Sequence, residues 1–218
     1  MAMKRIAVVT GGNKGIGKEI ATQLVESQIF SDVIIACRDK HRGENAVADI
    51  QAKVVSQNDD CKTSISCELV TIGDEVSHQR FHDVMAAKYE KIDVLVNNAA
   101  IAFKGSDPTP FHEQCKPTLD VNIRGTVDFT ERLLPLVRKG DDARIVNVAS
   151  MSGRLGQLRS SKLQSQFADP QLTKDQLLSL VGQFEADVMD GTHVSKGWGS
   201  SNYGLSSKSN TTPNILCV

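Results

Sequence analysis

The chain has 218 residues, of which 40% are hydrophobic and 23% charged, and its formal net charge is −1 at pH 7. This composition is ordinary for a globular protein, and the length allows one large domain with a substantial core. The charge balance argues against nucleic acid or an anionic membrane as the main partner, and no apolar run approaches the roughly 20 residues that span a bilayer.

The five cysteines are an odd number, lack metal-ligand spacing and follow no secretory signal. This pattern predicts free thiols in a reducing compartment and no metal site. We therefore expect a soluble, cytoplasmic protein without nucleic-acid or membrane partners.

Short apolar, β-branched runs alternate with stretches of helical periodicity. Strands are predicted over residues 5–10, 32–38, 64–70, 92–99 and 143–150, and helices over 17–28, 43–55, 78–89 and 119–137. Several strands are apolar on both faces, which suits a parallel sheet covered by helices. The alternation predicts an α/β fold, a doubly wound parallel sheet of the Rossmann type with right-handed crossovers.

The alternation stops after Ser150. Residues 154–198 contain one clear amphipathic helix, for which Thr173 is the predicted N-cap. Its apolar face consists of Leu177, Leu180, Val181 and Phe184. We expect a helical insertion over the carboxyl edge of the sheet, where such folds bind ligands.

The first strand leads directly into "TGGNKGIG", residues 10–17, and then into a helix. Three spaced glycines permit a tight turn, close approach of the backbone to a pyrophosphate and close helix–strand packing. The helix N-terminus adds unpaired N–H groups. A glycine triplet alone would also suit a structural turn, but this strand–turn–helix context predicts a dinucleotide site. The residues predicted to line it are Gly11, Asn13, Lys14, Gly15, Ile16 and Gly17.

The end of the second strand predicts which dinucleotide binds. An acidic residue there favours the ribose hydroxyl of NAD, whereas an arginine favours the 2′-phosphate of NADP. Here Arg38 comes first and Asp39 second, Arg42 follows one turn later, and Lys14 adds a cation from the glycine loop. Three cations outweigh one carboxylate and predict NADP(H). The alternative is that these are ordinary solvated charges.

Five motifs occur in order along the chain. They are "TGGNKGIG", "NNAA" (97–100), "DVNIRG" (120–125), "IVNVAS" (145–150) and "SNYGLS" (201–206). With them the chain resembles the short-chain dehydrogenases/reductases over essentially all residues up to 206. The asparagine and lysine of the glycine loop, the long separation of Ser150 from Tyr203 and the stretch "KGWGSSNYG" resemble more narrowly the NADPH-dependent carbonyl reductases of that family.

The resemblance implies a role for each matching residue. Tyr203 would be the general acid that protonates a carbonyl oxygen as hydride arrives, and Ser150 would hydrogen-bond that oxygen. Asn122 would hold a water in the proton relay, and Asn98 and Ala99 would line the cofactor's path. The substrates would be small aldehydes, ketones or quinones, and the protein would be a monomer. Taken alone, the serine suits an N-cap and the tyrosine a surface position.

The sequence departs from the family at two positions. The family's catalytic lysine follows the tyrosine by four residues, on the same helix face. Here that position is Ser207, and the lysine is Lys208, about 140° around a helix from Tyr203. We therefore expect Lys208 to point away from the phenol. The second departure is Thr71, which occupies the place of an aspartate that contacts adenine in the family.

Residues 207–218 also diverge, because they contain Pro213 and leave too few residues for a crossover to further strands. We expect a reductase domain over 1–206, a divergent tail over 207–218, missing last strands, and strand 143–150 as an exposed sheet edge. The predicted function is NADPH-dependent carbonyl reduction. The alternatives are a truncated, catalytically impaired NADP-binding isoform with a regulatory role, or a marginally stable fragment without function.

Overall fold

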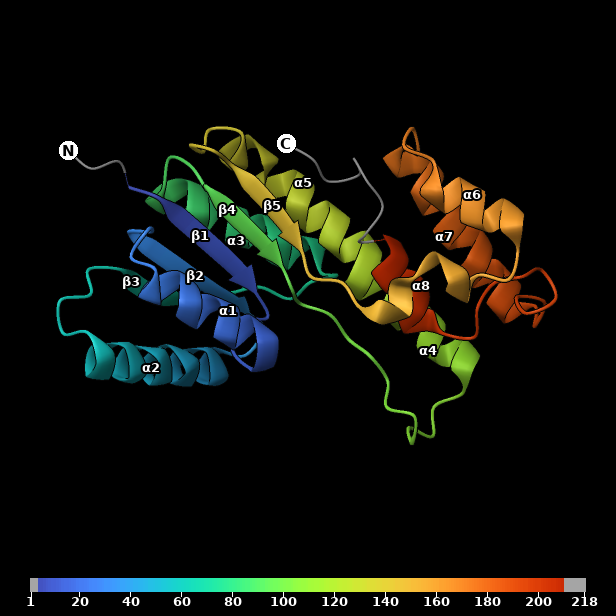
Figure 1. Cartoon of the computed structure of the whole chain (residues 1–218), viewed down its shortest axis with the longest axis horizontal. Coiled ribbons are helices and arrows are strands. Elements are labelled where there is room, and N and C mark those ends of the chain that lie inside the picture. The colour runs from blue at the N-terminus through green and yellow to red at the C-terminus, as the bar shows by residue number, and fades with distance from the viewer. Residues whose placement is uncertain (1–3, 210–218) are drawn as a thin grey trace. The chain divides into compact units, whose positions relative to one another are not determined.

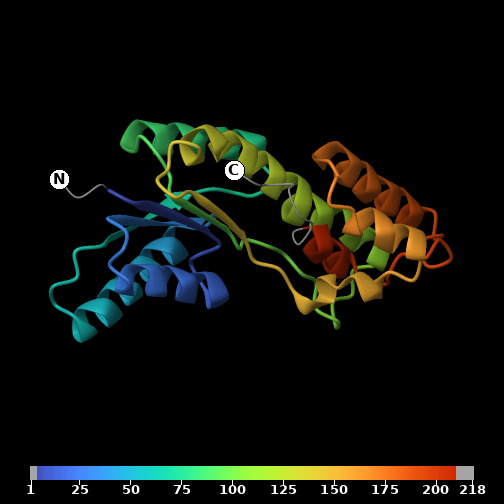
Figure 2. The same ribbon diagram turned by 45° about the horizontal axis from the view of Figure 1, so that its top comes forward.

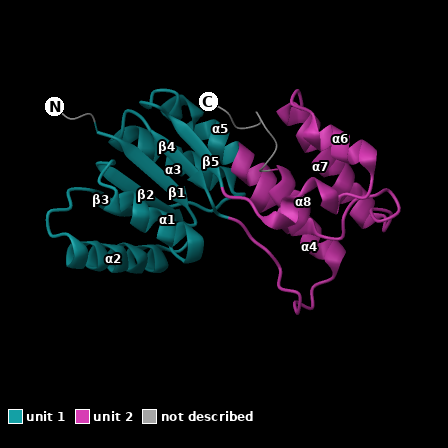
Figure 3. Cartoon of the chain, in the orientation of Figure 1, with its two compact units in different colours: residues 1–99, 128–147, 218 teal, residues 100–127, 148–217 magenta. Residues whose placement is uncertain are grey.

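The computed structural model describes residues 4–209 and divides them into two compact units. Unit 1 comprises residues 4–99 and 128–147, and unit 2 comprises residues 100–127 and 148–209 (Figure 3). Residues 207–209 of the predicted tail end a helix of unit 2, while residues 210–218 lie outside the described part of the chain.

Unit 1 contains a parallel sheet with the strand order β3-β2-β1-β4-β5 (Figure 1). The strands are β1 (Ile6–Thr10), β2 (Asp32–Cys37), β3 (Ser64–Leu69), β4 (Val94–Asn97) and β5 (Arg144–Asn147). All five predicted strands are present, although β4 and β5 are shorter than expected. The prediction of a doubly wound parallel sheet is confirmed.

Helices cover both faces of this sheet (Figure 2). One face is covered by α1 (Gly15–Glu26) and α2 (Lys40–Gln57), the other by α3 (Glu75–Lys88) and the unit 1 part of α5 (Thr126–Val137). Because both faces are covered, every residue of β1 is buried, whichever face it points to. Val8, for example, packs in the core with residues of α3 and α5. This explains why the central strands are apolar on both sides.

Strand β5 pairs only with β4 among residues 4–209, so it forms one edge of the sheet there. Its burial is incomplete: the Val146 side chain is 46% exposed. Strand β3 forms the opposite edge.

Unit 2 is helical. Its elements are α4 (Phe111–Leu119), a π-helical turn η1 (Asp120–Gly125), the 3-10 turns η2 (Met151–Gly153) and η3 (Leu155–Gln157), α6 (Ser161–Ala168), α7 (Lys174–Met189) and α8 (Asn202–Ser209). They enclose a core in which Phe184 and Phe167 pack edge-on against Trp198. No helix among the described residues is long and apolar enough to cross a membrane.

The predicted insertion helix is α7, and its N-terminus agrees with the sequence prediction. Thr173 caps the helix, accepting a hydrogen bond from the Gln176 N–H, while the Gln176 side chain accepts one from the Thr173 N–H. This reciprocal capping box is encoded locally. Helix α6 was not predicted, because only Leu163 and Phe167 among its eight residues are buried apolar residues.

Candidate active site

The loop after β1 has the backbone geometry of a phosphate-binding loop. Gly11 and Gly15 have φ angles of +64° and +54°, in the left-handed region that favours glycine. At Gly17 an added Cβ would lie 2.3 Å from Nδ2 of Asn98 and 2.5 Å from the Gly11 carbonyl oxygen. Lys14 occupies the N-cap of α1 without a side-chain cap bond, so the first N–H groups of α1 remain available to an anion. This loop fits the pyrophosphate of a dinucleotide.

Thr10 and Asn98 anchor the loop to the end of β4. The Thr10 hydroxyl accepts hydrogen bonds from the Asn98 and Ala99 N–H groups, each at 2.9 Å, and donates one to the Val96 carbonyl. The Asn98 side-chain amide donates to the Thr10 carbonyl at 2.9 Å. This role of Thr10 was not predicted from the sequence, where the only signal is a hydroxyl residue at the end of the first strand. Contact of Asn98 and Ala99 with a cofactor stays a prediction.

The charged residues that were weighed for binding of the 2′-phosphate fall into two groups. The Asp39 carboxylate caps α2 by accepting the Arg42 N–H at 3.0 Å, and it also lies 3.4 Å from Arg42 Nε. Asp39 and Arg42 are therefore engaged with each other. Arg38 and Lys14 are exposed and form no ion pair with any described residue. Arg42, predicted to be a third cofactor cation, is thus partly neutralised, whereas Arg38 and Lys14 are available to a phosphate.

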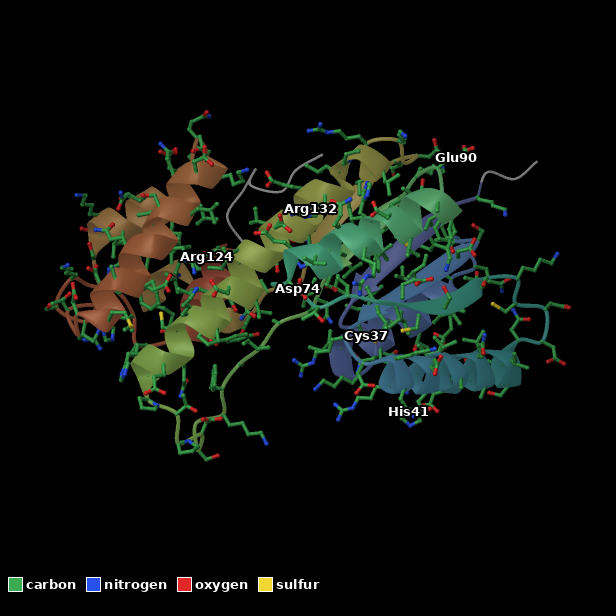
Figure 4. All side chains as sticks on the ribbon, turned by 180° about the vertical axis from the view of Figure 1, so that it is seen from behind. Cys37, His41, Asp74, Glu90, Arg124 and Arg132 are labelled. Carbon is green, nitrogen blue, oxygen red and sulfur yellow. The ribbon has the colours of Figure 1, made fainter. Side chains whose placement is uncertain are left out.

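Thr71, which takes the place of the family's aspartate, is exposed just beyond β3. Its N–H donates to the Ser77 hydroxyl at 2.9 Å. The nearest following carboxylate is Asp74, the N-cap of α3 (Figure 4), which accepts the N–H groups of Val76 and Ser77. Asp74 is therefore engaged in capping.

The predicted catalytic residues all belong to unit 2. Ser150 is the N-cap of η2, and its hydroxyl accepts the Ser152 N–H at 3.2 Å. Tyr203 is half-buried in the first turn of α8, and among residues 4–209 no hydrogen bond or ion pair involves its phenol.

Two glycines bring the backbones of α8 and η2 into contact. A Cβ on Gly204 would lie 2.9 Å from the Ser152 carbonyl oxygen, and a Cβ on Gly153 would lie 2.7 Å from the Lys208 nitrogen. The structure therefore places Ser150 and Tyr203 on two elements that pack directly on each other.

Asn122, in the π-helical turn η1, is 1% exposed. Its Oδ1 accepts the Ile101 N–H at 2.8 Å, and its Nδ2 donates to the Ile101 carbonyl at 2.9 Å and to the Ser206 hydroxyl at 3.0 Å. The Ser206 hydroxyl in turn donates to the Tyr203 carbonyl. Asn122 thus fastens α8 to the segment around Ile101, a positioning role that the sequence did not reveal. Its predicted water-holding role stays a prediction.

Lys208 is 2% exposed, and its ammonium group donates hydrogen bonds to the carbonyl oxygens of Gly153, at 3.0 Å, and Arg154. Burial lowers the pKa of this ammonium group to about 8. The side chain is directed at the turn that follows Ser150, in keeping with a register that turns it away from Tyr203. Ser207, at the position of the family's lysine, is also buried.

Residues 5–162 match the short chain dehydrogenase family. Carbonyl reductase (NADPH) 1 of Homo sapiens is 41% identical over 202 residues, which are 92% of this chain and 69% of that protein. The Mus musculus protein of the same name is 38% identical over the same share of each chain.

Two solved structures are similar over nearly the whole chain. Menthone neomenthol reductase from Mentha piperita has a TM-score of 0.83 and 27% identity, with 95% of this chain and 82% of that chain covered. Salutaridine reductase from Papaver somniferum has a TM-score of 0.80 and 26% identity, with 94% and 79% covered.

The strand order, the glycine loop, the family match over most of the sequence and the identity to the human relative lead to one conclusion. This chain belongs to the short-chain dehydrogenases, a family of oxidoreductases, and is similar within it to the NADPH carbonyl reductases.

Proposed function

We propose that this protein binds NADP(H) and reduces the carbonyl group of small aldehydes, ketones or quinones. The observation that carries the proposal is the packing of α8 on η2, because it sets a phenol and a hydroxyl on adjoining elements. The curated relatives are named as NADPH carbonyl reductases, which supports both the cofactor and the substrate class.

The residues of unit 1 support NADP(H) rather than NAD(H). The free N–H groups at the start of α1 would bind the pyrophosphate. Asp39, which would otherwise bind a ribose hydroxyl, is already engaged by Arg42. Arg38 and Lys14 would then hold the 2′-phosphate. When bound, NADPH supplies the hydride.

The residues of unit 2 would donate a proton and a hydrogen bond to the substrate oxygen. The Tyr203 phenol would donate a proton to it, and the Ser150 hydroxyl would donate a hydrogen bond as negative charge develops there. Asn122 would act as a positioning residue, because it fastens the helix that carries the phenol. A donor that is already held in place needs no reorganisation as negative charge develops on the substrate oxygen, and it therefore stabilises the transition state.

A second candidate function is NADP(H) binding with impaired turnover. Two observations favour it: Ser207 occupies the lysine position, and the Lys208 ammonium is directed at backbone carbonyls. A phenol without a cation beside it lacks the group that would assist its proton transfer. Such a protein would keep the phosphate loop and lose catalytic rate.

One experiment separates the two candidates. NADPH binding is followed by cofactor fluorescence, and menadione reduction is then followed in the same sample by loss of NADPH absorbance. Binding with turnover supports a reductase, and binding without turnover supports the impaired form. Absence of binding contradicts both. The cytoplasmic location and monomeric state expected from the sequence stay predictions.

A further inference from the structure

Two cysteine thiols meet at the β2–β3 side of the sheet in unit 1. Cys37 ends β2, Cys67 lies in β3, and their sulfurs are 3.5 Å apart. Helix α2 has a glycine where it crosses them, and a Cβ on Gly43 would lie 2.1 Å from the Cys67 sulfur and 2.8 Å from that of Cys37. The sulfurs therefore fill the space that a side chain at Gly43 would take.

The pair is accessible from one side. Cys67 lines a cavity of about 320 Å³, whose other lining residues include Lys40 and Glu44 of α2 and Arg80 of α3. Cys37 is 4% exposed and lies behind Cys67. A small molecule in the cavity would reach the dithiol at Cys67.

The hydrogen bond between the two thiols favours a single negative charge on the pair. It lowers the pKa of Cys37 to about 7. The same bond raises the pKa of Cys67, as do burial and the negative charges of Cys37, Glu68 and Glu44. The pair therefore loses its first proton more readily than an isolated thiol does and holds the second more tightly. Thiolates are the form of cysteine that attacks oxidants.

We propose that Cys37 and Cys67 form a reversible oxidation site for small hydroperoxides. Either sulfur can donate the hydrogen bond that joins them, so the negative charge can lie on Cys67, the sulfur that lines the cavity. The Cys67 thiolate attacks one peroxide oxygen, so an S–O bond forms, the O–O bond breaks, and the departing oxygen leaves as water or an alcohol after taking a proton. The second sulfur then displaces the sulfenic oxygen as water and an S–S bond forms. The sulfurs give up two electrons, which reduce the peroxide.

Disulfide formation requires the end of β2 to move. The register pairs Cys67 with Ile35 and Cys37 with Leu69, so the cysteines are diagonal neighbours. Diagonal α-carbons are about 7–8 Å apart, whereas a disulfide usually joins α-carbons within about 7 Å. The next residue is Arg38, so we expect oxidation to displace the predicted 2′-phosphate contact, a consequence that rests on the proposed function. By linkage, bound NADPH would then shift the equilibrium of the pair toward the reduced thiols.

Trypsin provides a direct test on the full chain, because each of the two cysteines falls in its own peptide, residues 19–38 and residues 63–80. Protein treated with hydrogen peroxide should yield these two peptides linked, two hydrogens lighter than their sum, and dithiothreitol should reverse the link. The expected result is this link as the main product at low peroxide. A main product at Cys61, Cys115 or Cys217, or no link, would overturn the proposal.

Cysteine variants and measurements of NADPH affinity test the oxidation site separately from the proposed reductase function. C67S should abolish the link, whereas the matched control C61S should keep it. Oxidised wild-type protein should bind NADPH about tenfold more weakly than reduced protein, and C67S should show no such change under peroxide. Reduced protein that fails to bind NADPH contradicts the proposed function, whatever the cysteines do. A link that forms without any change in NADPH affinity contradicts the coupling.

Discussion

Arg38 is the residue on which the proposed preference for NADPH depends most directly, because it is exposed after β2 and forms no ion pair with a described residue. Replacing it by alanine should weaken NADPH binding about tenfold and leave NADH binding unchanged, since only NADPH carries the 2′-phosphate. Fluorescence titration with both cofactors measures this. Equal losses for both cofactors would show that Arg38 acts on the fold and not on the phosphate.

Gly17 should be equally sensitive for a steric reason. A methyl group there would lie 2.3 Å from the Asn98 amide nitrogen and 2.5 Å from the Gly11 carbonyl oxygen. G17A should lower the free energy of unfolding by about 1–3 kcal/mol and weaken NADPH binding. The matched control is G182A in α7, where an added Cβ meets nothing within 4 Å. An unchanged NADPH affinity in G17A would contradict the geometry of the loop.

Lys208 should make stability depend on pH in an identifiable direction. Its pKa is about 8 in the folded protein, below the unfolded value near 10.4. Below about pH 8 the group is charged in both states, so the cost of burying that charge lowers the stability by its full amount. Between about pH 8 and 10.5 the unfolded chain holds more protons, so stability should rise with pH, by at most about 3 kcal/mol.

Urea unfolding of wild type and K208M between pH 7 and 10 tests this. The difference in unfolding free energy between the two proteins should move in favour of wild type as pH rises. A difference that stays constant over this range would show that the ammonium group is not desolvated.

At the scale of elements, the α8–η2 contact is the feature that the proposed chemistry needs most. A Cβ on Gly153 would meet the backbone of Ser207 and Lys208 at 2.7 Å, and backbone atoms cannot turn aside as a flexible side chain can. G153A should therefore displace α8 and lower kcat at least tenfold, while NADPH binding in unit 1 is retained. The control G156A, in η3 with open space at its Cβ, should keep both. Normal kcat in G153A would contradict this role for the contact.

The sequence predicted elements well where a local pattern encodes them. Strands β1 and β2 are runs of buried apolar residues, and the capping box at Thr173 is a local signal. Helix α4 was missed except for its last residue, Leu119, because the helix follows Pro110 and contains Pro117. The π-helical turn at Asp120–Gly125 was also missed, because its periodicity does not differ visibly from that of the flanking helices.

At the scale of the whole molecule, the strand order followed from the alternation of strands and helices, but the division into two units did not. Units are defined by contacts between distant segments. The end of the strand–helix alternation after Ser150 lies close to the boundary at residue 148, but no such change marks the boundary at residue 100. The same limit applies to the site. The glycines and Tyr203 were predicted from motifs, whereas the bonds of Thr10 to Asn98 and of Asn122 to Ser206 join residues more than 80 positions apart. Such pairs become visible only in the folded chain.

If this chain reduces carbonyl compounds with NADPH, the proton for the substrate oxygen should come from Tyr203. The most direct measurement compares NADPH binding and menadione turnover in wild type and Y203F, which retains the ring and removes only the hydroxyl. We expect equal NADPH affinity in both proteins, turnover in wild type, and a turnover at least about a hundredfold lower in Y203F. Equal turnover in the two proteins, or a wild-type chain that does not bind NADPH, would contradict it.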